Sequence, residues 1–142
     1  NYKQKIQYER ANNNNMSFLS TIKYEDLNNY LIENHNGFIY IASSSDASLE
    51  TFEKSFKEYI LDKELEHDFV YLDSSNYSSK IYTEIAEKYF SPRLRREQVY
   101  LNYQPNILYI EDGVIYDALY KNESKIVLQN VIDFVNKYEA QQ

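Results

Sequence analysis

The chain has 142 residues, enough for one domain with a sizeable buried core. Its formal net charge of −7 disfavours binding to nucleic-acid phosphates and to anionic lipid headgroups, because both need clustered Lys and Arg. The absence of cysteine excludes disulfide bonds, thiolate metal sites and dithiol–disulfide exchange.

Residues 1–15 are polar and end in four consecutive asparagines. This composition predicts a leader or stalk, followed by a single domain over residues 16–142. Because the chain starts at Asn1 and not at Met, we expect a preceding segment that anchors an extracytoplasmic domain to a membrane; the alternative location is the cytoplasm. No apolar run approaches the roughly 20 residues of a membrane span, so we expect no direct membrane insertion by this fragment.

The first third of the domain contains two predicted strands around one helix. A short apolar stretch at residues 16–20 predicts an edge strand, and apolar side chains at helical spacing predict a helix over residues 24–34. Residues 38–42 form a nearly continuous apolar run, which is typical of a strand covered on both faces.

The middle of the domain alternates between helix and strand. Residues 49–61 carry apolar side chains at helical spacing with Glu and Lys on the other face, and residues 68–73 predict a second buried strand. A helix that begins at Ser78 is expected to stop at Ser91 and Pro92.

The last third predicts a β-hairpin and a closing helix. Two apolar strands, residues 106–110 and 114–119, flank Asp112-Gly113, which is a strong hairpin signal. Residues 125–138 have the apolar spacing of a helix. The element order predicts an α/β fold with parallel strands, a C-terminal antiparallel hairpin and helices on both faces of a mixed sheet.

Three local features resemble the thioredoxin-like superfamily over about residues 16 to 139. The strand at residues 38–42 leads directly into Ser45-Asp46-Ala47-Ser48 and an amphipathic helix. The segment at residues 103–110 resembles the loop and strand of the family that carry its cis-proline, and residues 111–114 match the following hairpin. Within the superfamily, the chain is most similar to the bacteriocin-transport accessory group of Gram-positive bacteria.

The resemblance places serine at both positions of the redox-active cysteine pair. It implies that Ser45 and Ser48 occupy the nucleophilic and resolving positions, and that Pro105 is the cis-proline. Ser44 replaces the usual Trp, and Asp46-Ala47 replaces the usual Gly-Pro. We therefore expect no oxidoreductase activity, no other enzyme activity and no cofactor.

What the resemblance leaves is a groove that could hold a protein or an extended peptide. A cis bond before Pro105 would expose the backbone of Gln104 for pairing with such a peptide. The sequence thus favours a non-catalytic binding or scaffold module accessory to a bacterial envelope or secretion system. The predicted groove residues are Ser44, Ser45, Asp46, Ala47, Ser48, Gln104 and Pro105.

A serine nucleophile would need a neighbouring base, and the chain has only two histidines. In the predicted fold, His35 and His67 lie in loops at the end of the sheet opposite Ser45, so we expect no Ser–His pair. The structural interpretation of the serine-rich turn is that Ser44, Ser45 or Asp46 caps the following helix.

Two charged clusters have simple structural interpretations. We interpret Glu64, Glu66, His67 and Asp68 as a charged loop and predict no metal site there. We interpret the arginines at positions 93, 95 and 96 as a local ion-pairing site, with a partner contact as the alternative.

Two other functions remain open from the sequence. The chain could be a thiol–disulfide oxidoreductase whose cysteines were replaced by serine. It could also be a structural oligomerisation domain with a tyrosine-rich surface, because tyrosine is enriched at protein interfaces and the 16 tyrosines cannot all be core. The candidate surface tyrosines are Tyr71, Tyr82, Tyr100, Tyr103, Tyr109, Tyr116 and Tyr120.

Overall fold

The computed structural model describes residues 15–101, 105–121 and 124–139. The strands are β1 (Ser20–Thr21), β2 (Asn36–Ala42), β3 (Phe69–Asp73), β4 (Asn106–Glu111) and β5 (Val114–Leu119). The α-helices are α2 (Leu27–Glu33), α3 (Glu50–Asp62), α4 (Lys80–Tyr89), α5 (Pro92–Arg96) and α6 (Leu128–Glu139). Three short 3₁₀ helices are η1 (Tyr24–Asp26), η2 (Ala47–Leu49) and η3 (Ser74–Asn76).

The five strands form one mixed sheet in the order β1-β3-β2-β4-β5. Strands β1, β3 and β2 are parallel, whereas β4 is antiparallel to both β2 and β5. Asp112 and Gly113 join β4 to β5 with positive φ angles of 55° and 75°, as a two-residue hairpin turn requires. The predicted α/β fold with a mixed sheet and a C-terminal hairpin is confirmed.

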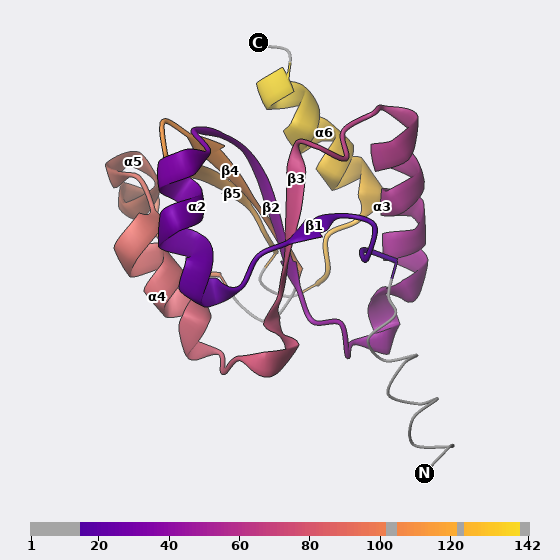
Figure 1. The fold of residues 1–142 in the computed structure, drawn as a ribbon, viewed down its shortest axis with the longest axis horizontal. Helices are drawn as coiled ribbons and strands as arrows, with labels where there is room; N and C mark the ends of the chain where they lie inside the picture. Colours follow the sequence, from indigo (N-terminus) through magenta and orange to yellow (C-terminus); the bar gives the residue numbers. More distant parts are fainter. Residues whose placement is uncertain (1–14, 102–104, 122–123, 140–142) are drawn as a thin grey trace.

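Helices cover both faces of the sheet (Figure 1). Because side chains alternate along a strand, Phe38 and Tyr40 of β2 point into the core shared with α3 and α6, whereas Ile39 and Ile41 point into the core shared with α2 and α4. All four side chains are at most 1% exposed. The apolar run that identified this strand in the sequence therefore reflects burial on both faces.

Of the 13 tyrosines in the described part of the chain, five are buried: Tyr40, Tyr71, Tyr82, Tyr109 and Tyr138. Tyr40 and Tyr71 stack with ring centroids 5.8 Å apart, and Tyr109 and Tyr138 stack at 3.8 Å. Of the seven candidate surface tyrosines, Tyr71, Tyr82 and Tyr109 are buried, Tyr116 and Tyr120 are half-buried, and Tyr100 is 71% exposed; Tyr103 lies outside the described residues. Tyr71, Tyr82 and Tyr109 are therefore not available to a tyrosine-rich surface, and the oligomerisation hypothesis stays a prediction.

The predicted edge strand at residues 16–20 is wrong in position. Met16 and Leu19 are buried in a turn closed by the Leu19 N–H to Met16 carbonyl bond, and the strand covers only Ser20 and Thr21. The side chains of Met16 and Leu19 belong to the core on the α3 side, so this short apolar run reflects tertiary packing and not strand pairing.

Helix α5 is not among the elements predicted from the sequence. The Ser91 hydroxyl caps it by accepting from the Leu94 N–H at 3.2 Å, and Pro92 stands in its first turn, where its missing N–H costs nothing. Helix α6 begins at Leu128, three residues later than predicted.

The segment around α5 covers the outer edge of β5. The Ser91 N–H donates to the Ile115 carbonyl at 2.8 Å, and Arg93 donates to the Tyr116 carbonyl at 2.7 Å. Arg93 also pairs with Glu97 at 2.7 Å and with Asp117 at 3.8 Å. The local ion-pairing interpretation is thus correct for Arg93, and the contacts protect part of an exposed sheet edge.

Glu53 of α3 is a carboxylic acid buried in the core, with only 4% of its surface exposed. It accepts a 2.7 Å hydrogen bond from the Tyr40 hydroxyl. Burial, together with the negative charges of Asp46 and Asp73, raises the pKa of Glu53 to about 7, although the Tyr40 bond opposes this shift.

The described residues contain no helix both long and apolar enough to cross a membrane.

Replacing Ile39 by alanine should destabilise the fold by about 2–5 kcal/mol, because the side chain is fully buried in the middle of the sheet. Ile32→Ala is the matched control, since Ile32 of α2 is 64% exposed and its loss should change stability by less than about 0.5 kcal/mol. Urea denaturation of both variants measures the difference. Equal effects would contradict the burial of β2.

The Glu53→Gln variant should be more stable than the wild type at pH 8 and lose that advantage towards pH 5. The pKa of Glu53 is about 7 in the folded chain, and we take the ordinary value of 4.5 for the unfolded chain. Between these two pH values only the folded chain keeps the proton, so the stability of the wild type falls as the pH rises from 4.5 to about 7. We expect a difference on the order of 1–3 kcal/mol in the free energy of unfolding at pH 8, measured by urea denaturation. Glu58→Gln, an exposed change on the same helix, should leave the pH profile unchanged, and identical profiles for the two variants would refute the account.

Candidate functional site

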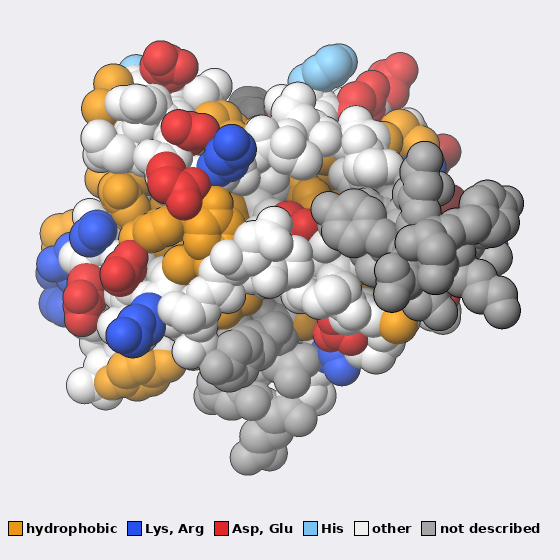
Figure 2. All heavy atoms as spheres, turned by 60° about the horizontal axis from the view of Figure 1, so that its bottom comes forward, with side chains coloured by type: hydrophobic (Ala, Val, Ile, Leu, Met, Phe, Trp, Pro, Cys, Tyr) orange, Lys and Arg blue, Asp and Glu red, His pale blue; other side chains and the backbone are white. Residues whose placement is uncertain are grey.

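The serine turn and Pro105 lie at the same end of the sheet. In the antiparallel pairing of β2 with β4, Ile41 lies opposite Asn106, so the chain leaves β2 beside the point where it enters β4. Residues 43–48, which follow β2, and the buried Pro105, which precedes β4, therefore lie at the same end of the sheet, onto which Figure 2 looks. Gln104 and its bond to Pro105 lie outside the described residues, so the cis-proline stays a prediction.

The serine-rich turn is held by hydrogen bonds among its own side chains. The hydroxyls of Ser43 and Ser45 lie 2.7 Å apart, and the Ser45 N–H donates to the Ser43 hydroxyl. One carboxylate oxygen of Asp46 accepts from the Ser48 N–H at 3.0 Å and from the Ser48 hydroxyl at 2.5 Å. Of the three capping candidates named from the sequence, Asp46 is therefore the one that caps the following helix, η2.

Asp73 fastens this turn to the end of β3. Its Oδ1 accepts from the backbone N–H of Ser44 at 2.9 Å and from that of Ser75 at 3.0 Å. Burial by itself would raise the pKa of the Asp73 carboxyl, but the hydrogen bonds from Ser44 and Ser75 outweigh it and hold the pKa below its usual value. The turn is thus fixed on two sides before any ligand arrives.

The two histidines lie far from the serines. His35 directly precedes β2, whereas Ser45 follows it, and a seven-residue strand spans about 20 Å. The carbonyl of His35 accepts from the Gly113 N–H of the hairpin at that opposite end, and His67 precedes the parallel strand β3. The expected separation is confirmed, and neither histidine can act as a base for Ser45.

The charged loop that contains Glu64, Glu66, His67 and Asp68 also lies at the end opposite the serines, between α3 and β3. Within residues 15–101, 105–121 and 124–139, no three His, Asp or Glu side chains are grouped so that they could share a metal ion. The serine turn offers hydroxyls, backbone groups and carboxylates, and it has no thiol and no neighbouring histidine.

A hollow that the sequence did not reveal lies beside the turn. Its volume is about 310 Å³, and it is formed by residues from the segments 17–23 and 71–77. Asp73 and Tyr71 contribute from the end of β3, and Thr21 and Lys23 contribute from β1 and its following loop. These segments are about 50 residues apart in the chain and meet only because β1 pairs with β3.

No family model and no curated protein matches the chain. Solved structures do match it. Thioredoxin f2 of Chlamydomonas reinhardtii is 10% identical with a TM-score of 0.55, covering 85% of this chain and 96% of that one. A thioredoxin of Schistosoma mansoni is 18% identical with a TM-score of 0.50, covering 86% of this chain and 98% of that one.

Both similarities extend over nearly the whole length of the thioredoxins. At these identities they establish the fold and not the activity. Together with the sheet order and the hairpin, they show that this chain, which has no cysteine, has a thioredoxin-like fold.

Proposed function

We propose that the chain is a non-catalytic binding module, which holds an extended segment of a partner protein at the end of the sheet where β2 finishes and β4 begins. The observation that most supports the proposal is the pairing of Ile41 with Asn106, because it puts the start of the serine turn and Pro105 at the same end of the sheet. The proposed contact residues are those of the predicted groove: Ser44, Ser45, Asp46, Ala47, Ser48, Gln104 and Pro105.

The turn is suited to binding because it is both accessible and internally braced. Ala47 and Ser48 are exposed, whereas Asp46 and Asp73 hold the backbone of the turn by hydrogen bonds. A braced surface loses little conformational entropy when a ligand binds, which favours affinity. The carboxylates of Asp46, Glu50 and Asp73 favour a partner segment that carries Lys or Arg.

The proposed setting is a bacterial envelope or secretion system, with the domain anchored outside the cytoplasmic membrane. Two features of the sequence support this setting: its resemblance to the bacteriocin-transport accessory group and the polar composition of residues 1–15.

Blocking the groove should abolish peptide binding. The test probes an array of short peptides of varied charge with the wild-type chain, which we expect to bind the peptides that contain Lys or Arg. Ala47→Trp adds a large side chain at an exposed position of the turn, so this variant should no longer bind those peptides. Ile32→Trp is the matched control, because Ile32 is 64% exposed on α2, the helix that leads to His35 at the other end of the sheet. Array signals that survive Ala47→Trp, or that both variants remove equally, would contradict the proposed groove.

Restoring both sulfurs should not restore an efficient enzyme. In the double variant Ser45→Cys, Ser48→Cys, the adjacent Asp46 carboxylate opposes ionisation of the thiols, and a pKa higher by one unit means about tenfold less thiolate near neutral pH. We expect insulin reduction at least about tenfold slower than by a thioredoxin in the same assay.

Adding Asp46→Asn to the double variant removes the opposing charge and should speed insulin reduction. Reduction by the double variant at the rate of a thioredoxin would instead favour the hypothesis that the serines replace the cysteines of an oxidoreductase.

A further inference from the structure

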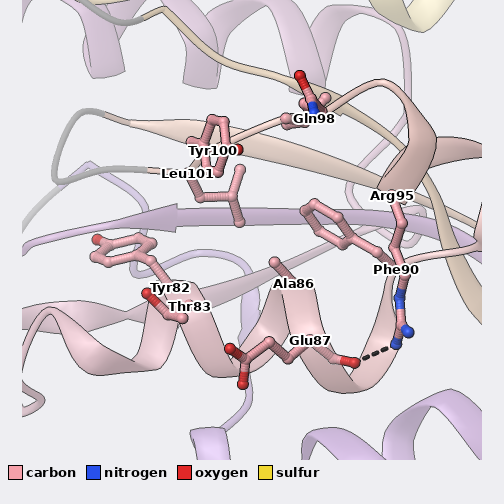
Figure 3. A pocket seen from close by; sticks show the side chains of 10 residues that line it. Tyr82, Thr83, Ala86, Glu87, Phe90, Arg95, Gln98, Tyr100 and Leu101 are labelled. Atoms are coloured by element: carbon pink, nitrogen blue, oxygen red, sulfur yellow. Dashed lines mark hydrogen bonds between the residues drawn. The ribbon is translucent and has the colours of Figure 1, made fainter.

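An apolar groove lies between α4 and the segment at residues 98–101, apart from the serine turn (Figure 3). Its volume is about 520 Å³, which lies within the range of small-molecule sites. Figure 2 shows hydrophobic side chains gathered on the side of the molecule that α4 and α5 occupy in Figure 1, bordered by acidic and basic ones.

The wall of the groove is aromatic and aliphatic. Tyr82 and Phe90 are 4% and 5% exposed and form its floor with the half-buried Ala86 and Leu101. Tyr100 stands at the rim and is 71% exposed, more than any other large hydrophobic side chain in the described part of the chain. An apolar ligand in the groove would remove part of this ring from water, which is favourable.

One end of the groove carries a cation. Arg95 donates from Nη2 to the backbone carbonyl of Glu87, near the C-terminus of α4, where a positive charge is favoured. In Figure 3 the side-chain carboxylate of Glu87 lies on the other side of that residue, towards Thr83.

Arg95 differs from its neighbour Arg93 in its partners. Arg93 pairs with Glu97 and Asp117, whereas no carboxylate of the described residues lies within ion-pair distance of Arg95. A guanidinium has five N–H donors, so most of those of Arg95 are available to an anion at the groove. Helix α5 concentrates three of the 15 cationic residues of an acidic chain within four positions.

We propose that this groove binds a small organic anion with an apolar or aromatic body. Its carboxylate would bond to Arg95, and its body would lie along Tyr82, Ala86, Phe90 and Leu101, under the ring of Tyr100. The combination of a largely apolar wall with Arg95, which has no carboxylate partner among the described residues, favours this class. An inorganic anion would leave most of the wall uncovered, and a neutral ligand would make no ion pair with Arg95.

The test is an NMR titration of the ¹⁵N-labelled chain with sodium octanoate, and with 1-octanol as its uncharged counterpart. We expect octanoate to shift amide signals of α4, α5 and residues 98–101, and to bind more tightly than octanol. Arg95→Gln should weaken octanoate binding about tenfold and leave octanol binding unchanged, because only the anion uses the guanidinium.

Arg96→Gln is the matched control, since Arg96 is an exposed arginine of the same helix and does not line the groove. It should leave both affinities unchanged. Thr83→Trp, at an exposed position of the groove on α4, should weaken both ligands by filling the space. Circular dichroism checks that each variant keeps the fold of the wild type.

Three outcomes would overturn the proposal: octanoate shifts that map outside the groove, octanol binding as tight as octanoate binding, or equal effects of Arg95→Gln and Arg96→Gln. Because Ala47 and the serine turn take no part in the groove, Ala47→Trp should leave octanoate binding intact. Loss of peptide binding and loss of octanoate binding are therefore separable results.

Discussion

Strand β2 is the element on which the other parts of the molecule depend, because it hydrogen-bonds to β3 on one side and to β4 on the other. Phe38, Tyr40, Ile39 and Ile41 fill the cores on both faces of the sheet, so a shift of one residue would exchange the two sets of side chains. The same pairing brings Ile41 opposite Asn106 and so decides which loops meet at the end of the sheet. The position of the candidate groove is thus a consequence of the register of one strand.

The turn after β2 is held in place by hydrogen bonds among its own side chains and to β3. The hydroxyls of Ser45 and Ser48 are engaged with Ser43 and Asp46, and the hydrogen bonds of Asp73 join the turn to β3. An acidic, cysteine-free turn at a helix start presents hydrogen-bonding groups without a nucleophile that could ionise.

The sequence predicted the elements that form through interactions between residues close together in the chain. The buried strands β2 and β3 appear as apolar runs, and Asp112-Gly113 specifies the hairpin through two positive φ angles. The stretch around Met16 misled the prediction because tertiary packing buries a turn there. Helix α5 was missed because it has five residues, too few for a periodic signal, although Ser91 and Pro92 are a legible helix start. The hollow at Asp73 and the groove at Arg95 each combine segments separated in the chain, so no local pattern reveals them.

The central claim is that β2 and β4 pair in the antiparallel register that brings Ile41 opposite Asn106 and Phe38 opposite Tyr109. Cross-strand nuclear Overhauser effects in the labelled chain in solution measure this pairing directly. The account predicts backbone contacts between both pairs of residues. Contacts displaced by one residue would contradict it because the two core faces of the strand would be exchanged, and a parallel pattern would contradict it because the serine turn and Pro105 would lie at opposite ends of the sheet.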